Sequence, residues 1–304
     1  MLTRRAILSI IVSLVAGAAT SIGASAQTPA KISALATFSI LGDIVRNVGG
    51  DRVEVSTLVG PDGDAHVYAP TPADARRLSE AKIVVTNGLK FEGWIDRLVK
   101  SSGTRAPTIE AARAVAALKS EDDHGHAHAG MDPHAWQNVA NVKLYVAAIC
   151  DGLTNVDPDG RAIYEANAAA YLAKLDALDA EIRALIDSIP KENRRIITSH
   201  DAFRYFGSAY GVTFVAPQGV STDAEASAKD VSKIIQQIRR EKVRAVFVEN
   251  VSDPRLMQRI AAETGATLGA RVYSDALSGP DGPAATYIDM MRHNIRAFSA
   301  ALSS

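Results

Sequence analysis

The chain of 304 residues contains one cysteine, Cys150, which lies in an apolar pattern of helical spacing. A single cysteine cannot form an internal disulfide, so the stability of the fold must come from the size of its hydrophobic core. We expect Cys150 to be a small buried apolar residue rather than a thiolate metal ligand. Hydrophobic residues make up 47% of the chain and charged residues 22%, as in an ordinary soluble globular protein.

An excess of charge of one sign is also lacking. The chain has 33 basic and 34 acidic residues, and without the two arginines near its N-terminus the counts are 31 and 34, which is a net charge of −3. This balance argues against a nucleic-acid-binding protein and against attachment to a membrane through a polybasic surface.

A long hydrophobic run is lacking as well. The N-terminal apolar run, residues 6–16, follows two arginines, breaks at Gly17 and leads into small residues up to Ala26. This order is typical of a secretory signal peptide cleaved after Ala26, and the run is too short for a membrane anchor. No lipobox-like cysteine follows it. We therefore expect a free periplasmic protein that starts at Gln27, rather than a lipid-anchored one.

What is present is an alternation of short β-prone runs and helical patterns, which occurs twice along the chain. Strands are predicted at 31–37, 53–59, 83–87, 195–198, 212–216, 243–248 and 267–272, with a strand and turn at 108–118. Helices are predicted at 38–48, 73–81, 91–100, 139–153, 202–210, 228–240, 254–264 and 287–302. Thr71 is a predicted N-cap, with Pro72 as the first helical residue. Strand, helix and strand joined by short turns predict an α/β fold with parallel sheets.

Between the two alternating regions lies an Ala-rich stretch without glycine or proline from Arg161 to Ile189. It predicts one long helix of roughly 40 Å, long enough to connect two domains. A helical hairpin within one domain is the alternative, but no turn signal interrupts the middle. We therefore predict an N-terminal α/β lobe at 27–159, a linking helix at 160–189 and a C-terminal α/β lobe at 190–304.

Three histidines and one aspartate occur in loops at or near the end of a predicted strand or at the start of a helix. They are His66, His134, His200 and Asp275. Ligands of open parallel sheets bind at the carboxyl ends of strands, and three imidazoles with one carboxylate suit a tetrahedral divalent cation. The sequence therefore predicts a metal site in the cleft between the lobes. Three of the four also have an ordinary interpretation: an Asx turn before His66, a helix start at His200 and a turn cap at Asp275.

Three further histidines, His124, His126 and His128, alternate with glycine and alanine. A mobile backbone of this kind cannot fix a coordination geometry, so the three are predicted accessory metal ligands or members of a solvated loop. Glu249 follows an apolar strand and is interpreted as an acceptor that fixes a histidine tautomer, as a substitute ligand or as an acceptor for backbone N–H groups. His293, on the terminal helix, is interpreted as a surface residue.

Four segments in this order resemble the solute-binding proteins of metal-transporting ABC importers, the cluster A-I proteins that include zinc and manganese receptors and streptococcal adhesins. The segments are Gly60-Pro61-Asp62-Gly63-Asp64-Ala65-His66, Met131-Asp132-Pro133-His134-Ala135-Trp136, Thr198-Ser199-His200-Asp201-Ala202-Phe203 and Tyr273-Ser274-Asp275-Ala276-Leu277. The resemblance implies two lobes of about four strands each, a rigid linking helix and a buried metal between them. It also implies that His66, His134, His200 and Asp275 are the metal ligands.

The resemblance implies a receptor that passes its ion to an inner-membrane ABC permease. Manganese receptors of the family usually carry Glu at the third ligand position, and an imidazole at His200 favours Zn²⁺ over Mn²⁺. The segment from Tyr273 onwards resembles the manganese branch equally well, so a manganese or iron receptor is the alternative. The histidine-rich segment is shorter than in many zinc receptors, and the C-terminal disulfide that some of them carry is impossible here.

Two other classes of protein were weighed. An exported zinc-dependent hydrolase is one, but the sequence contains no His-Glu-x-x-His motif and offers Glu249 as its only candidate base. An adhesin, or a receptor for metal chelates such as haem or siderophores, is the other, and chelates would need a wide apolar or basic cleft. We expect a monomeric binding protein, not an enzyme, with no nucleic-acid partner and with a possible metal donor protein.

Overall fold

Strand β1 (Ile32–Phe38) lies in the centre of the first sheet of a computed structural model that describes residues 31–120 and 130–303. It pairs in parallel with β2 (Val53–Val59) and β3 (Ile83–Thr86), and β3 pairs with β4 (Thr108–Glu110). The strand order is β2-β1-β3-β4. Four of the five last residues of β1 are apolar, and all five are buried, as expected for a strand covered on both faces.

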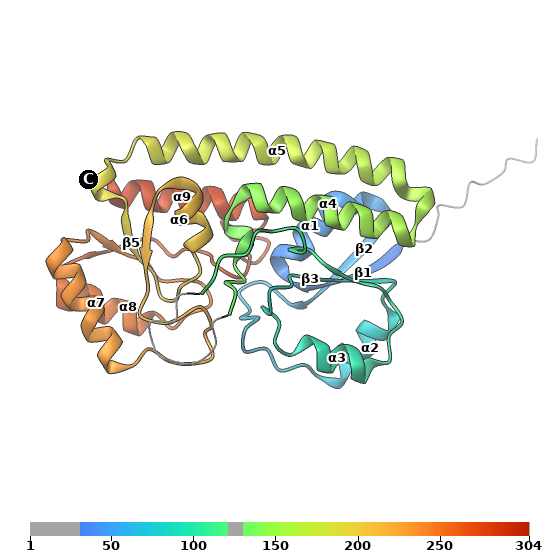
Figure 1. The fold of residues 1–304 in the computed structure, drawn as a ribbon, viewed down its shortest axis with the longest axis horizontal. Helices are drawn as coiled ribbons and strands as arrows, with labels where there is room; N and C mark the ends of the chain where they lie inside the picture. Colours follow the sequence, from blue (N-terminus) through green and yellow to red (C-terminus); the bar gives the residue numbers. More distant parts are fainter. Residues whose placement is uncertain (1–30, 121–129, 304) are drawn as a thin grey trace, which may run out of the picture. The chain divides into compact units, whose positions relative to one another are not determined.

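Helices cover both faces of this sheet (Figure 1). Helices α1 (Ser39–Gly49) and α4 (Val139–Val156) pack on one face, and α2 (Pro72–Glu80) and α3 (Ile95–Ser102) lie on the other. The start of α2 confirms the predicted cap. The Thr71 hydroxyl accepts the Asp74 N–H, the Asp74 carboxylate accepts the Thr71 N–H, and Pro72 is the first helical residue.

The second half repeats the α/β alternation of the first, as the sequence predicted, and its sheet has the same strand order. This sheet is β6-β5-β7-β8, formed by β5 (Arg195–Ile197), β6 (Thr213–Val215), β7 (Ala245–Val246) and β8 (Thr267–Leu268). Helices α6 (Arg204–Tyr210) and α9 (Tyr287–Leu302) lie on one face, with α7 (Ala228–Glu241) and α8 (Pro254–Thr264) on the other (Figure 1). Asp253 caps α8 by accepting the Arg255 N–H at 2.9 Å.

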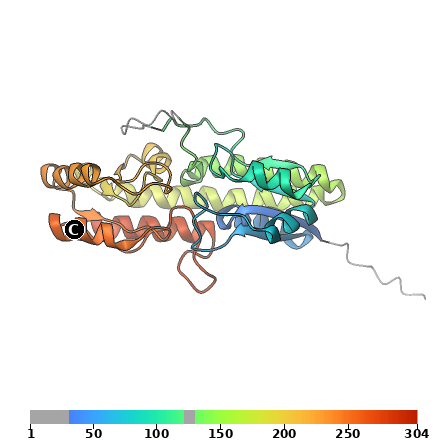
Figure 2. The same cartoon turned by 90° about the horizontal axis from the view of Figure 1, so that it is seen from below.

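Helix α5 (Arg161–Asp187) is one continuous helix of 27 residues. It packs on α1 and α4 of the first half and on α9 of the second. It runs along both sheets in the two perpendicular views (Figures 1 and 2). Its buried residues recur at helical spacing, so one apolar stripe faces both halves: Tyr164, Ala168, Tyr171, Leu175, Leu178, Ile182 and Ile186. The long linking helix predicted from the sequence is confirmed, and the lobe boundaries at 27–159 and 190–304 stay predictions.

The described residues belong to one compact unit, and no helix among them is both long and apolar enough to cross a membrane. A single cluster of buried side chains extends from β1 through α5 to α9, and a smaller one lies beneath α7 and α8. Cys150 is partly buried on α4 and has a free thiol. The predicted signal peptide and His124, His126 and His128 lie outside the described residues.

The last two strands of the second sheet are shorter than predicted. The pattern predicted strands at 243–248 and 267–272, whereas β7 and β8 contain two residues each. After β7 and β8, the two following segments stay next to each other and form an isolated parallel bridge between Glu249 and Val272. The predicted strands were therefore too long, because they included the segments that follow β7 and β8 and lead to the loops described next.

Candidate metal centre

The four residues predicted as ligands come from separate segments and meet between the two sheets. His66 lies in the loop after β2, His134 precedes the turn that begins α4, His200 follows β5, and Asp275 lies in the segment after β8. One nitrogen or oxygen atom from each residue lies within 4.8 Å of those from the other three. Among the described residues, these four form the group of His, Cys, Asp or Glu side chains that could hold a metal ion.

The same ring atom of each imidazole points to the centre of the group. His66 Nε2 lies 3.2 Å from His134 Nε2 and 3.3 Å from Asp275 Oδ2. His200 Nε2 lies 3.1 Å from Asp275 Oδ2, and His134 Nε2 lies 3.6 Å from Asp275 Oδ1. Three nitrogen lone pairs and a carboxylate in this arrangement match the donor set of a tetrahedral cation.

Burial shows that these groups do not face solvent. His134, His200 and Asp275 have no exposed surface. Within the described residues, His200 Nε2 and both carboxylate oxygens of Asp275 make no hydrogen bond of acceptable geometry, although they lie close to one another. Buried polar atoms without hydrogen bonds are costly and rare. Atoms that converge on a shared point, rather than on each other, fit the coordination of one ion.

Two of the histidines have a carboxylate at their outward ring nitrogen. Asp132 Oδ1 lies 2.8 Å from His134 Nδ1 and accepts the His134 backbone N–H at 2.9 Å. Glu249 Oε2 lies 2.5 Å from His200 Nδ1, and Glu249 Oε1 accepts the His200 backbone N–H at 2.9 Å. A carboxylate at Nδ1 fixes the tautomer that leaves Nε2 free to bind a metal. Glu249 therefore accepts a backbone N–H, as one interpretation from the sequence had it, and its Oε2 lies beside His200 Nδ1, where an acceptor that fixes the tautomer would lie, without a hydrogen bond of acceptable geometry among the described residues.

The charges of the site shift the pKa values of its members. Burial alone would lower the pKa of His134, but Asp275 and Asp132 raise it to about 9. Burial acts in the same direction on His200, and Glu249 with Asp275 raises its pKa well above the usual value. Burial lowers the pKa of His66, which has no such pair of carboxylates. The pKa of Asp275 is held well below its usual value by His200 and His134, although burial opposes this.

Hydrogen bonds across the two halves hold His134 and Asp275 in place. The side chains of Trp136 and Gln137, in the turn after His134, both donate to the Ser274 carbonyl at 2.8 Å. Helix α9 holds the same segment, because Asn294 accepts the Tyr273 N–H at 2.9 Å and donates to the Tyr273 carbonyl at 2.7 Å. The neighbours of two ligands from opposite lobes are therefore bonded directly to one another.

A hollow of about 660 Å³ opens beside the group, and His66 is the one of the four residues that lines it. Phe91 and Pro133 of the first half line it together with residues 217–221 and 223–227 of the second half. The ring of Phe91 packs edge-on against His66, with ring centroids 4.7 Å apart. The hollow is thus the side from which the group is approached.

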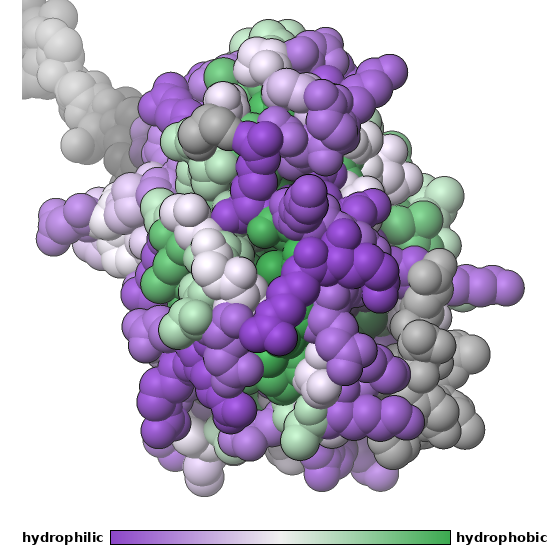
Figure 3. All heavy atoms as spheres, turned by 90° about the vertical axis from the view of Figure 1, so that its left-hand side faces the viewer, coloured by the Kyte–Doolittle hydropathy of each residue, from purple (hydrophilic) through white to green (hydrophobic). Residues whose placement is uncertain are grey.

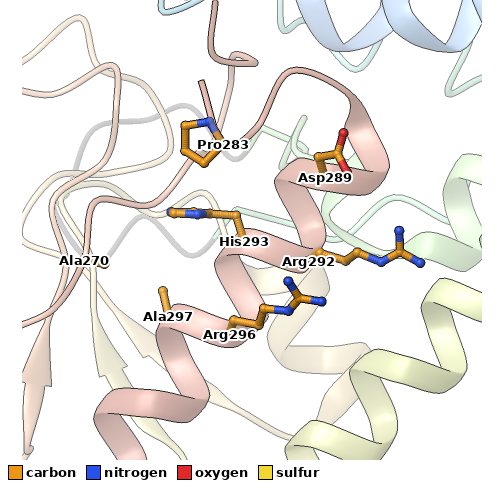
Figure 4. Close-up of a pocket in the computed structure, with 7 residues that line it drawn as sticks. All are labelled: Ala270, Pro283, Asp289, Arg292, His293, Arg296 and Ala297. Atoms are coloured by element: carbon orange, nitrogen blue, oxygen red, sulfur yellow. The ribbon is translucent and has the colours of Figure 1, made fainter. Parts of the chain in front are cut away.

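Two other hollows contain basic residues but no set of converging ligands. In the first, of about 300 Å³, Figure 4 shows Arg292 and Arg296 pointing away from the His293 ring. Both pair with Glu181 on α5, and His293 Nε2 lies 2.8 Å from the Arg271 carbonyl. His293 is partly exposed, in keeping with the surface position predicted for it, but it is bonded to the backbone.

The other hollow, of about 530 Å³, lies where α7 and α8 end, and is lined by Arg239, Lys242 and Arg244. Arg239 donates to the Glu263 carbonyl at 2.7 Å, as expected of a cation near the negative end of a helix. Figure 3 views the molecule from the side on which α7 and α8 lie, and hydrophilic side chains cover most of that face. Among the described residues, neither hollow contains a set of converging metal ligands like His66, His134, His200 and Asp275.

Sequence reasoning did not identify the role of Asp132, although it offered an Asx turn before His66, where Asp64 lies. Each aspartate stands two residues before a predicted ligand, and each accepts the N–H of that histidine, Asp64 Oδ1 from His66 at 2.9 Å. The signal was the repeated Asp-x-His spacing, which is that of an Asx turn. The Asx turn before His66 had been considered as an alternative to a ligand role. The structure contains both the turn and the His66 ring within the group of four residues.

Comparison with known proteins agrees with this geometry. The family model described as ZnuA, "Zinc-uptake complex component A periplasmic", matches residues 35–301. The manganese-binding lipoprotein MntA of Halalkalibacterium halodurans is 34% identical over 297 residues, which cover 98% of this chain and 97% of that protein. The manganese ABC transporter substrate-binding lipoprotein PsaA of Streptococcus pneumoniae is 31% identical over 306 residues, 98% of each chain.

Solved structures show the same fold. The periplasmic zinc-binding protein TroA of Treponema pallidum superposes with a TM-score of 0.85 at 29% identity, over 90% of this chain and all of that chain. The Mn-bound periplasmic metal-binding protein of Candidatus Liberibacter asiaticus gives a TM-score of 0.81 at 29% identity with the same coverage. With a family model that covers most of its length, this chain belongs to the ZnuA family of metal-binding substrate-binding proteins of ABC transporters.

Proposed function

We propose that the protein captures Zn²⁺ with His66, His134, His200 and Asp275 and delivers it to an ABC permease. The observation that supports this most directly is the convergence of three imidazole Nε2 atoms and one buried carboxylate within 4.8 Å. Zinc is bound in proteins by such nitrogen and oxygen donors, usually four of them. In this proposal the metal is the cargo of a receptor.

The choice of Zn²⁺ over Mn²⁺ rests on the donors. Three of the four groups are imidazoles, which suit zinc, whereas carboxylate and carbonyl oxygens suit manganese. The relatives include proteins named for either metal, MntA and PsaA for manganese and TroA for zinc. A manganese receptor with the same four ligands is therefore the second candidate, and a direct competition between the two ions separates them.

A receptor fits the site better than a hydrolase does. Catalytic zinc sites usually have three protein ligands and keep a position for water, whereas four protein ligands close a tetrahedral site. Glu249, the only base that the sequence offered to a hydrolase, is occupied by the ring and the backbone of His200. Members of the family are substrate-binding components of ABC transporters, and these work with a membrane permease.

We further propose that the protein acts in the periplasm. The support is the N-terminal sequence, with its two arginines, short apolar run and Ala-x-Ala site ending at Ala26. The named relatives MntA and PsaA are lipoproteins, whereas the only cysteine of this chain is Cys150. Fractionation of cells that express the full chain, followed by mass analysis of the N-terminus, tests both the location and the start at Gln27.

The test of metal capture is elemental analysis of protein purified without chelators. We expect one equivalent of zinc in the wild type and less than a tenth of an equivalent in His200→Ala and Asp275→Ala, because each change removes one of four donors. His293→Ala is the matched control, since that histidine lies on α9 outside the group. Equal zinc in all four proteins would contradict the ligand assignment, and preferential retention of manganese would make this a manganese receptor.

A further inference from the structure

The two Asp-x-His turns of the site differ in one respect. In both, the aspartate accepts the backbone N–H of the histidine two residues later at 2.9 Å. Asp132 also contacts the ring of its histidine, at 2.8 Å. Asp64 makes no contact with the ring of His66 among the described residues. Its second oxygen, Oδ2, instead accepts a hydrogen bond of 2.7 Å from the hydroxyl of Thr222, which belongs to the other half of the molecule.

Thr222 lies in the segment that connects β6 to α7, and this segment also contacts His200. Gln218 forms a parallel bridge with His200, the Gln218 N–H donates to the Ser199 carbonyl, and the Asp201 N–H donates to the Gly219 carbonyl at 3.1 Å. The same short stretch of chain therefore pairs with the backbone of one candidate ligand and reaches the backbone of another through Asp64.

His66 is the ligand for which such support matters most. It is the one of the four that lines the 660 Å³ hollow, which is also lined by Ser221 and Asp223, the chain neighbours of Thr222. Its side chain retains 5% exposure, while the other three ligands have none. The His66 loop is bonded to the second half at two points: Asp62 donates its N–H to the Leu277 carbonyl at 2.8 Å and accepts from the Asn250 amide at 3.1 Å, and Asp64 accepts from Thr222. Of these, the Thr222 contact lies nearer to His66 in the chain and acts on the carboxylate that also accepts the His66 N–H.

We propose that Thr222 is a positioning residue for metal retention: through Asp64 it holds the His66 loop closed over the bound ion and slows its dissociation. The inference rests on the proposed function, because it needs His66 to be a ligand. It assigns no metal contact to Thr222 itself. The specific consequence is kinetic: Asp62 anchors the start of the loop, and the Thr222 hydroxyl, which holds the Asp64 turn next to His66, affects how often His66 leaves the ion.

The experiment compares Thr222→Val, which keeps the shape of the side chain but cannot donate, with the wild type. Zinc-loaded protein is mixed with an excess of a chromogenic chelator, and the rate of zinc loss is followed by stopped flow. We expect a loss roughly tenfold faster from Thr222→Val, the effect of one hydrogen bond between a neutral and a charged group, with one equivalent of zinc still bound at the start. Thr222→Ser should restore the slow rate, because it restores the hydroxyl.

Ser221→Ala is the matched control, since the Ser221 hydroxyl, next in the chain, accepts only the local Asp223 N–H at 3.3 Å. It should lose zinc at the wild-type rate. The inference is overturned if Thr222→Val releases zinc at the wild-type rate, or if Thr222→Ser releases it as fast as Thr222→Val. Asp64→Ala combined with Thr222→Val should release zinc no faster than Asp64→Ala alone, and additive effects would also contradict it. A wild type that binds no zinc would instead refute the proposed function.

Discussion

At the scale of single residues, two of the histidines are each paired with a carboxylate that lies beside the Nδ1 atom of the ring. Asp132 contacts both Nδ1 and the backbone N–H of His134, and Glu249 accepts the backbone N–H of His200 and lies 2.5 Å from its Nδ1. A ring held in this way presents Nε2 to the ion and becomes a stronger donor. If the proposed ligands are right, we therefore expect the outer carboxylates to contribute to metal affinity without binding the metal themselves.

Glu249→Gln tests this contribution. The amide retains an oxygen that can accept the His200 N–H, but it removes the negative charge beside Nδ1. We expect zinc affinity to fall by about 10- to 100-fold, the usual cost of losing such a partner. Competition with a fluorescent zinc chelator measures it, and Glu241→Gln, at the end of α7, serves as the control. An unchanged affinity would show that the carboxylate only supports the backbone.

At the scale of elements, a buried ion pair fixes the start of the linking helix. The Asp157 carboxylate, just before α5, accepts hydrogen bonds from the Arg52 guanidinium, with Nη2 at 2.8 Å, and from the Tyr164 hydroxyl at 2.6 Å. Arg52 lies in the turn between α1 and β2, and Tyr164 lies on α5. The contact therefore joins the linking helix to the edge of the first sheet. The Arg52 hydrogen bond lowers the pKa of Asp157 to about 2.

A lowered pKa in the folded state means that this carboxylate stabilises the fold above its unfolded pKa, near ~3.9, and that the stabilisation is lost as the pH falls toward about 2. We expect Asp157→Asn to lower the free energy of unfolding of the zinc-free protein by about 1 kcal/mol at pH 7, after allowance for solvent screening. The difference should shrink between pH 4 and pH 2 in urea titrations. Asp159→Asn, exposed in the same turn, is the control. A difference independent of pH would contradict this origin.

The elements and the ligand loops were predictable from the sequence because both follow from local patterns. The Thr71 cap, the uninterrupted stripe of α5 and the position of His66 after a parallel strand depend on residues close together in the chain. The Asp64–Thr222 bond joins residues 158 positions apart, and it depends on how two loops fit together once both sheets exist. No period or spacing in the sequence records such a contact.

At the scale of the whole molecule, the two sheets share one hydrophobic core. The cluster that contains Phe38 of β1 also contains Leu178 of α5 and Phe298 of α9. A second, smaller cluster is confined to the second sheet beneath α7 and α8 and includes Ile234 and Met257. Because the larger cluster and α5 connect both halves, neither half can lose its packing without exposing apolar surface of the other. The two lobes should therefore unfold together.

Scanning calorimetry tests this expectation. We expect one cooperative transition for the zinc-free protein, and one transition at higher temperature with zinc, because the ion binds only the folded state and joins ligands from both lobes. At a free zinc concentration of about 1,000 times Kd the stabilisation is about 4 kcal/mol, which corresponds to a rise of roughly 8 °C in Tm for a protein of this size. His200→Ala should show the single transition without the shift. Two separate transitions, of which zinc moves only one, would show instead that the lobes are independent and that the shared core and α5 do not couple them.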